Sequence, residues 1–88
     1  MNFLKNKIFG IIGEEAAAMN TRAFVIGGYV RDSLLGRKSK DIDIVIEGSG
    51  IEVAERVAGR LGVNLTVFRS FGTAMLRYGK MEVEFVGA

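Results

Sequence analysis

Two aspartates, Asp41 and Asp43, stand two residues apart in the apolar segment "DIDIVI". Side chains on a strand alternate between its faces, so both carboxylates would point to one side and Ile42 and Ile44 to the other. With a rise of about 3.3 Å per residue, the aspartate backbones would lie about 6.5 to 7 Å apart, within reach of a shared cation. Because neighbouring like charges favour protonation, a bound cation would stabilise the pair. A turn cap beside an exposed strand start would give the same pattern.

A second pair of carboxylates, Glu82 and Glu84, occurs in "MEVEFV". On a strand these two glutamates share one face, and Val83 and Phe85 share the other. One of them, on a strand next to the aspartates, would complete a site for two ions. An amphipathic edge strand facing water would show the same alternation. The sequence does not choose between the two glutamates.

A glycine pair, Gly27 and Gly28, stands between an apolar run and a short expected helix. Glycines let the backbone approach a ligand closely, and the free amides at the start of a helix bind anions such as phosphate. Arg31 could add a charged donor to that phosphate. An ordinary turn, with Arg31 paired to Asp32, fits the same letters.

The composition restricts the chemistry of any metal site. The 88 residues contain no cysteine and no histidine, which excludes disulfides, thiolate sites and the usual zinc sites. A metal must therefore be held by oxygen, which favours Mg²⁺, Mn²⁺ or Ca²⁺. Four of the twelve basic residues lie within the ten positions before Asp41: Arg31, Arg37, Lys38 and Lys40. A solvated turn explains this cluster as well as a ligand-binding site does.

The alternating and helical patterns predict one α/β (α+β) domain, with a mixed five-stranded sheet and its helices mainly on one face. Ser49 and Glu52 have the spacing of a capping box, and Gly62 ends that helix. The six phenylalanines are expected in the core rather than on a base-stacking platform, because they are scattered across the expected elements. The expected elements are an N-terminal helix with Leu4, Ile8, Ile11, Ile12 and Met19 on one face, a strand at 24–26, a helix at 29–35, a strand at 41–47, a helix at 48–62, and strands at 63–68, 73–78 and 81–86.

The N-terminal segment carries lysines before an apolar run, as secretory signals do, but Glu14 and Glu15 interrupt it early. No segment is long enough to cross a bilayer. We therefore expect a cytoplasmic protein with no membrane partner.

The segment "VIGGYVRDSLLGRKSKDIDIVI" resembles the signature of the class II tRNA nucleotidyltransferase (CCA-adding enzyme) and poly(A) polymerase family. The catalytic head domain of that family carries G-G-x-V-R-D-x-L-L-G, a short basic spacer and D-x-D. The downstream "FGTAMLRYGKMEVEFV" is similar to the later strands of the same head. The resemblance implies a polymerase-beta-like nucleotidyltransferase head.

The resemblance also implies roles for individual residues. Asp41 and Asp43 would be the catalytic metal ligands for Mg²⁺ or Mn²⁺, and Glu82 the general base or supporting ligand. Gly27, Gly28 and Arg31 would bind the triphosphate of ATP or CTP, and Asp32 would be a positioning residue. The acceptor would be an RNA 3′ end, with tRNA as the expected substrate for CCA addition or polyadenylation.

Family members continue into neck, body and tail regions, whereas this chain ends at Ala88. We therefore expect residues 1–88 to form a head domain without those regions. Such a head would be an excised or split domain, or a minimal transferase that depends on a partner chain for selectivity. The alternative function is an inactive fragment or assembly module that folds and oligomerises, and a third is transfer to a small molecule or protein.

Overall fold

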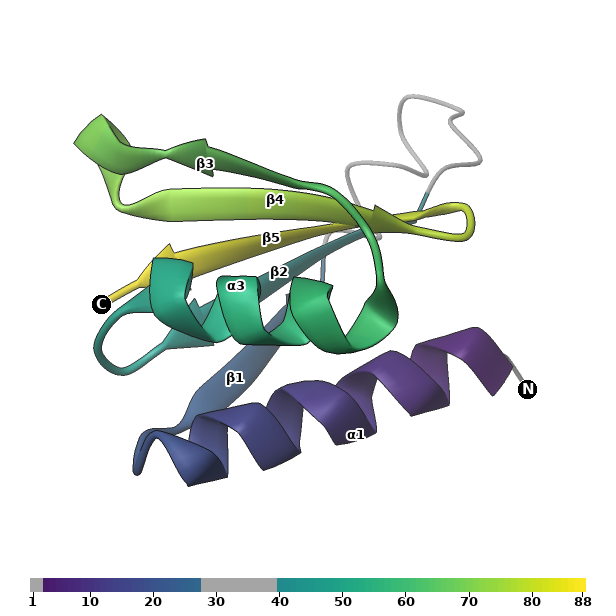
Figure 1. Cartoon of the computed structure of the whole chain (residues 1–88), viewed down its shortest axis with the longest axis horizontal. Coiled ribbons are helices and arrows are strands. Elements are labelled where there is room, and N and C mark those ends of the chain that lie inside the picture. Colours follow the sequence, from purple (N-terminus) through teal and green to yellow (C-terminus); the bar gives the residue numbers. More distant parts are fainter. Residues whose placement is uncertain (1–2, 28–39) are drawn as a thin grey trace.

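The computed structural model describes residues 3–27 and 40–88, apart from the side chains of residues 3–6, 40 and 41. The expected helix at 29–35 lies outside the described residues. The other expected helices and strands are present, with bounds that differ by a few residues (Figure 1). They are α1 (Phe3–Ala18), β1 (Ala23–Gly27), β2 (Lys40–Ile46), α3 (Gly50–Leu61), β3 (Leu65–Phe68), the 3₁₀ turn η1 (Arg69–Phe71), β4 (Thr73–Tyr78) and β5 (Met81–Gly87).

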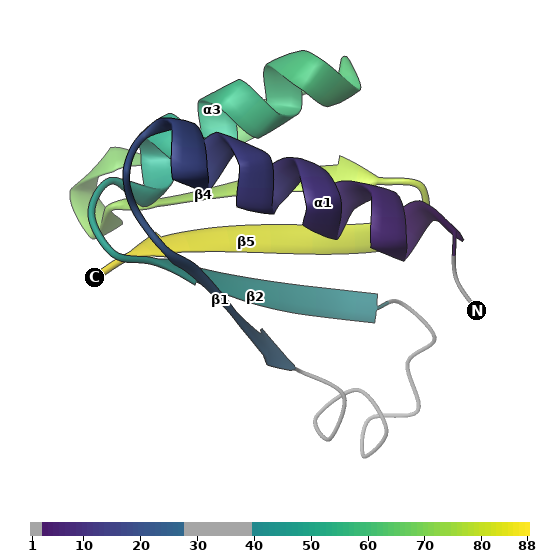
Figure 2. The ribbon, with the colours of Figure 1, turned by 90° about the horizontal axis from the view of Figure 1, so that it is seen from below.

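The five strands form one mixed sheet in the order β1-β2-β5-β4-β3. Strands β2 and β5 are parallel, and the other neighbouring pairs are antiparallel. Both described helices cover the same face of the sheet, and the other face carries no described helix (Figure 2). This arrangement confirms the predicted α+β fold with a mixed five-stranded sheet. No helix in residues 3–27 or 40–88 is long and apolar enough to cross a membrane.

The core lies between the sheet and its two helices. The isoleucines of β2 alternate inward, as the sequence predicts, and Ile44 is fully buried. Strands β4 and β5 present their alternate residues to the same layer, and Phe85 of β5 is the largest fully buried side chain. The buried strand residues are Ile42, Ile44, Ile46, Ala74, Leu76, Met81, Val83 and Phe85. Alternation therefore leaves the carboxylates of β2 and β5 on the opposite face.

Helix α3 begins and ends at the predicted caps. The Ser49 side chain accepts a hydrogen bond from the Glu52 amide at 3.2 Å, which satisfies one free donor of the first turn. Gly62 ends the helix with a left-handed φ of 69°, a conformation that favours glycine. Between these caps one stripe of the helix is buried against the sheet: Val53, Ala54, Val57 and Ala58.

The start of α3 passes very close to the end of β5. A Cβ atom at Gly50 would lie 2.7 Å from the backbone nitrogen of Gly87 and 2.9 Å from the carbonyl carbon of Val86. Both atoms belong to backbone, so neither can rotate away. Position 50 therefore requires glycine for a steric reason.

Replacing Gly50 with alanine should lower the free energy of unfolding by about 1–3 kcal/mol, the usual cost of inserting a methyl group into a packed site. Gly59 of the same helix is the matched control, because its Cβ would meet no atom within 4 Å. Gly59→Ala should be stabilising by about 0.5–1 kcal/mol through helix propensity. Urea denaturation of both variants checks the pair, and a Gly50→Ala variant as stable as Gly59→Ala would contradict the close contact.

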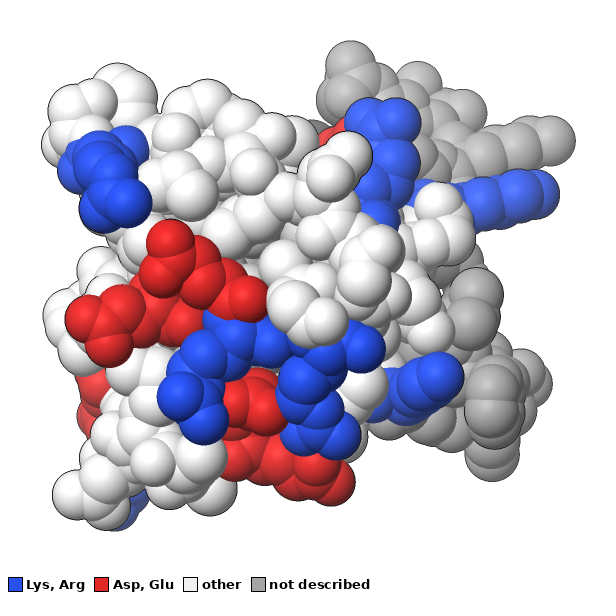
Figure 3. Space-filling view, viewed as in Figure 1, with Lys and Arg blue, Asp and Glu red and all other residues white. Residues whose placement is uncertain are grey.

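Helix α1 packs on α3 through apolar residues and through a carboxylate whose burial the sequence does not indicate. Ile8, Ile11 and Ile12 are buried as predicted. Glu15 is nearly buried beside them, with 12% of its side chain exposed. On the helix-bearing face, acidic and basic side chains lie intermixed (Figure 3). The described contact between the helices is therefore partly ionic.

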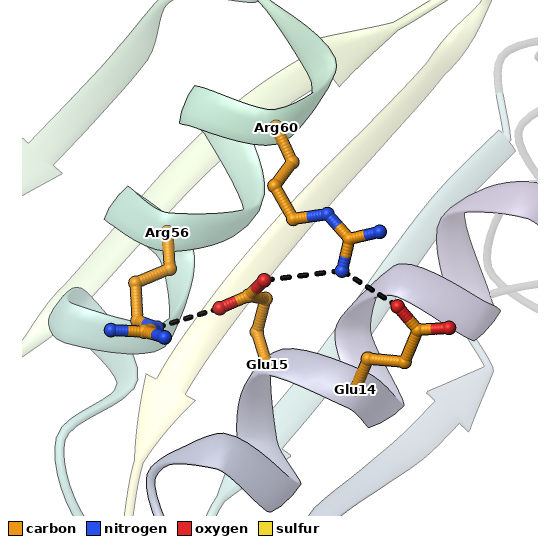
Figure 4. A network of polar contacts seen from close by, with 4 residues as sticks. All are labelled: Glu14, Glu15, Arg56 and Arg60. Atoms are coloured by element: carbon orange, nitrogen blue, oxygen red, sulfur yellow. Dashed lines mark hydrogen bonds and ion pairs between the residues drawn. The ribbon is translucent and has the colours of Figure 1, made fainter.

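Glu15 connects the two helices through arginines of α3 (Figure 4). Its Oε1 accepts a hydrogen bond from Arg56 Nε at 2.6 Å, and its Oε2 accepts one from Arg60 Nη1 at 3.1 Å. Arg60 Nη1 also donates to Glu14 Oε1 at 2.7 Å. The hydrogen bond from Arg56, helped by Arg60 and opposed by burial, holds the pKa of Glu15 below its ordinary value of 4.5.

This ionic contact predicts a pH-dependent contribution to stability. A carboxyl group whose folded pKa is depressed stabilises the fold above its unfolded pKa, and loses that contribution as pH falls through the folded value. Glu15→Gln should therefore lower the melting temperature at pH 7, and the difference from the unmodified chain should shrink below about pH 4.5. Glu14→Gln is the control and should have a smaller effect, because 67% of its side chain is exposed. A melting-temperature difference that stays constant with pH would exclude this role.

Candidate functional site

The face of the sheet opposite the helices brings four acidic residues together. The parallel register of β2 and β5 places Asp41 beside Glu82 and Asp43 beside Glu84. Their neighbours Ile42 and Val83 are buried on the helix side. Neighbouring strands lie about 4.8 Å apart, so each aspartate has a glutamate of β5 as its closest lateral neighbour. The sequence predicted both pairs, and the structure shows that they are adjacent.

Three rows of residues cross this open face of the sheet. Each row is defined by the pairing of neighbouring strands and contains residues that share a face. The first row is Asp41, Glu82 and Arg77; the second row is Ile26, Asp43, Glu84, Met75 and Thr66; the third row is Phe24, Val45, Val86, Thr73 and Phe68. The open face is thus charged at the first row and mainly apolar at the third.

An arginine on β4 is bonded to one of the two glutamates. Arg77 Nη2 donates to Glu82 Oε2 at 2.6 Å, across the antiparallel pair of β4 and β5. Arg77 is 70% exposed and Glu82 34% exposed, so solvent screens this ion pair. No ion pair of Asp43 or Glu84 occurs within the described part of the chain. Neither segment by itself indicates the pairing of Arg77 with Glu82, because that pairing depends on strand register.

The acidic side chains of the open face are suitable ligands for a hard cation. The four acidic residues of the first two rows carry carboxylate oxygens, the kind of ligand that Mg²⁺ and Mn²⁺ prefer. Among the side chains that the structure describes, which do not include that of Asp41, no three acidic groups are close enough to hold a metal ion.

Of the predicted phosphate-binding residues, the structure describes Gly27. Gly27 ends β1 and pairs with Ile42, so it lies beside the aspartates of β2. Gly28 and Arg31 lie outside the described residues, as do Arg37 and Lys38 of the basic cluster. The phosphate-binding role of Gly27 stays a prediction.

The prediction that all six phenylalanines lie in the core is wrong for three of them. Phe85 is fully buried and Phe9 packs against the core. Phe24, Phe68 and Phe71, however, are 46%, 39% and 79% exposed. Phe24 and Phe68 lie on the two edge strands and share the open face, and Phe71 lies in η1. An apolar residue on an edge strand looks like core in the sequence, because composition does not show which strands are central.

Comparison with known proteins gives matches to one family along most of the chain. Residues 23–87 match the poly A polymerase head domain family. Over 67 residues the chain is 51% identical to an A-adding tRNA nucleotidyltransferase of Aquifex aeolicus (strain VF5), covering 76% of this chain and 8% of that protein. It is 42% identical over 67 residues to an A-adding tRNA nucleotidyltransferase of Geobacter sulfurreducens, covering 76% of this chain and 7% of that protein. The chain thus spans less than a tenth of the length of these two relatives.

Solved structures share the fold as well as the sequence. A tRNA-processing enzyme in an apo form superposes with a TM-score of 0.82 at 43% identity, over 100% of this chain and 24% of that one. A tRNA nucleotidyltransferase complexed with a primer tRNA and an incoming ATP analog superposes with a TM-score of 0.74 at 48% identity, over 88% of this chain and 22% of that one. Together with the match over residues 23–87, these similarities establish that the chain belongs to the poly A polymerase head domain family.

Proposed function

We propose that this chain is the catalytic head of a nucleotidyltransferase that adds nucleotides from a nucleoside triphosphate to the 3′ end of RNA, with tRNA as the acceptor. The observation that carries the proposal is the β2–β5 register, which sets Asp41 and Asp43 beside two glutamates on the open face of a head of this family. Similar proteins are named as A-adding and CC-adding tRNA nucleotidyltransferases. ATP, CTP and a tRNA 3′ end are therefore the proposed partners, and the cytoplasm the proposed location.

The carboxylates would hold divalent ions against the phosphates of the incoming nucleotide. Bound there, Mg²⁺ or Mn²⁺ supplies charge neutralisation on the phosphate oxygens and lowers the pKa of the attacking hydroxyl. Asp41 and Asp43 provide the fixed oxygen ligands, since both extend from one central strand with a packed apolar face behind it. The amides at Gly27 and Gly28, with Arg31, are proposed to orient the triphosphate.

The identity of the third carboxylate depends on Arg77. Glu82 is the residue that the family resemblance implies, but its carboxylate is already bonded to Arg77. Glu84 lies beside Asp43 and has no ion pair with any described residue. A carboxylate without an arginine partner is better able to bind a cation. We therefore propose Glu84 as the cation ligand, with Glu82, the residue that the family resemblance implies, as the alternative.

Comparing Glu84→Gln with Glu82→Gln tests this choice. If Glu84 is the ligand, its variant should need at least about tenfold more Mg²⁺ for half-maximal nucleotide addition, by analogy with metal sites that lose a supporting group. Glu82→Gln serves as the matched control on the same strand and face. The opposite ranking in a Mg²⁺ titration would assign the role to Glu82.

A primer-extension assay tests the proposed function as a whole. A labelled single-stranded RNA with a free 3′ hydroxyl, incubated with ATP or CTP and Mg²⁺, should be extended by the chain and should not be extended in EDTA. The alternative, an assembly module without catalysis, predicts no extension and a stable oligomer by light scattering. That combination of results would reject the enzymatic proposal.

A further inference from the structure

Two exposed aromatic side chains and an arginine occur together where β3 ends and the η1 turn follows, at the end of the sheet that carries the third row. Phe68 is the last residue of β3 and belongs to the third row, and Phe71 ends the adjoining η1 turn. They are 39% and 79% exposed. Arg69, between them in the sequence, is also exposed and has no ion pair with any described residue. Large apolar side chains in contact with water suggest a binding surface.

This surface is continuous with the carboxylate site. Thr73 of the third row and Met75 of the second row are two residues apart on β4, which separates the rows by about 7 Å. The first row, at Arg77, is about 14 Å from the third. The η1 turn lies at the end of the sheet opposite the β4–β5 hairpin (Figure 1). Phe68 lies on β3, separated from β2 by β5 and β4, so a chain molecule that runs from the aspartates across those two strands toward that end would meet the aromatic residues.

The direction of the reaction indicates which ligand comes from that end. In-line transfer places the attacking hydroxyl and the leaving pyrophosphate on opposite sides of the reacting phosphorus. Gly27, at the proposed phosphate-binding turn, pairs with Ile42 next to the first row. Phe24, at the other end of β1, pairs with Val45 in the third row. With the triphosphate at that turn, the pyrophosphate would leave toward the first row, and the acceptor hydroxyl would approach from the third.

We propose that Phe68 and Phe71 bind the unpaired bases next to the 3′ end of the RNA acceptor by stacking, and that Arg69 contacts the RNA backbone. This inference rests on the proposed function and adds an acceptor subsite to it. Aromatic faces beside a cationic group are the usual means by which proteins bind single-stranded nucleic acid without reading its sequence. Phe24 is in the same row but on β1, at the edge of the sheet opposite β3 and next to β2, and is not part of the subsite.

An introduced tryptophan provides a direct test of base stacking, because the chain contains no other tryptophan whose fluorescence would interfere. Phe71→Trp places a single tryptophan at the proposed subsite and preserves an aromatic face. Titration with a short single-stranded RNA carrying a 3′ hydroxyl should quench and shift its emission, as stacking on a base does. Phe24→Trp is the control and should show no such change. Equal quenching at both positions, or none at position 71, would overturn the proposal.

Affinity measurements separate stacking from simple hydrophobic contact. By fluorescence anisotropy with labelled RNA, Phe71→Leu and Phe68→Leu should each weaken binding about 5- to 100-fold, the range that corresponds to one stacked base. Phe71→Tyr should bind like the unmodified chain, and Phe24→Leu should also be unchanged. Full binding by Phe71→Leu, or absence of RNA binding by the unmodified chain, would contradict the subsite.

Two further measurements keep this inference distinct from the proposed function. Mg²⁺-dependent ATP binding to Phe71→Leu reports on the carboxylate site alone and should be unaffected. If ATP binding is intact but RNA binding does not depend on Phe68 or Phe71, the subsite is wrong and the catalytic proposal stands. If the unmodified chain self-associates and Phe71→Leu abolishes association without changing RNA binding, the surface is a protein interface and the proposal fails.

Discussion

Asp41→Asn and Asp43→Asn are each expected to reduce Mg²⁺-dependent nucleotide addition at least about a hundredfold. The physical reason is that a cation ligand contributes several kcal/mol to stabilising charge in phosphoryl transfer, and each 1.4 kcal/mol is a factor of ten. Asparagine keeps the size of aspartate and removes its charge, so the fold should be preserved. Initial rates of labelled nucleotide addition to RNA, together with calorimetry of ATP binding in Mg²⁺, measure the effect.

Glu47→Gln is the matched control for these two variants. Glu47 follows β2 directly, is exposed, and has a long ion pair of 3.9 Å to Arg22. Neutralising it removes one negative charge near the same strand without touching the open-face rows. Its nucleotide addition should match that of the unmodified chain. Calorimetry that showed identical Mg²⁺-dependent ATP binding in Asp41→Asn, Asp43→Asn and Glu47→Gln would refute the metal assignment.

Phe85→Ala should reduce the free energy of unfolding by about 3–5 kcal/mol, the usual cost of deleting a buried phenyl ring. Phe85 is completely buried on β5, which lies between β2 and β4 at the centre of the sheet. A small domain is stable by only about 5–15 kcal/mol, so this single change removes a large part of the total. Urea denaturation followed by circular dichroism measures the loss.

Phe71→Ala is the control for Phe85→Ala, because it makes the same chemical change at a side chain that is 79% exposed. Its stability should stay within about 0.5 kcal/mol of the unmodified chain. Equal destabilisation by the two variants would mean that Phe71 is buried in solution, which would also remove the basis of the RNA subsite. The comparison therefore tests the core and the aromatic surface together.

Much of the local structure could be predicted from short-range patterns. The alternation in "DIDIVI" and "MEVEFV" assigned isoleucines and valines to one face and carboxylates to the other, since side chains on a strand have a period of two. The Ser49 and Gly62 caps were predicted from residue chemistry that depends only on nearby backbone. The glycine, arginine and D-x-D signature indicated the family, which residues 23–87 confirm.

The relations between distant segments were decided only by the tertiary structure. Asp41 meets Glu82 because β5 pairs in parallel with β2, and nothing in either segment specifies that register. The hydrogen bond between Glu15 and Arg56 joins residues 41 apart in the sequence. Likewise Phe68 is exposed because β3 is an edge strand, whereas Phe85 is buried because β5 is central. Alternation determines which side chains share a face, but only the packing of all the strands and helices determines which faces are covered and which charges meet.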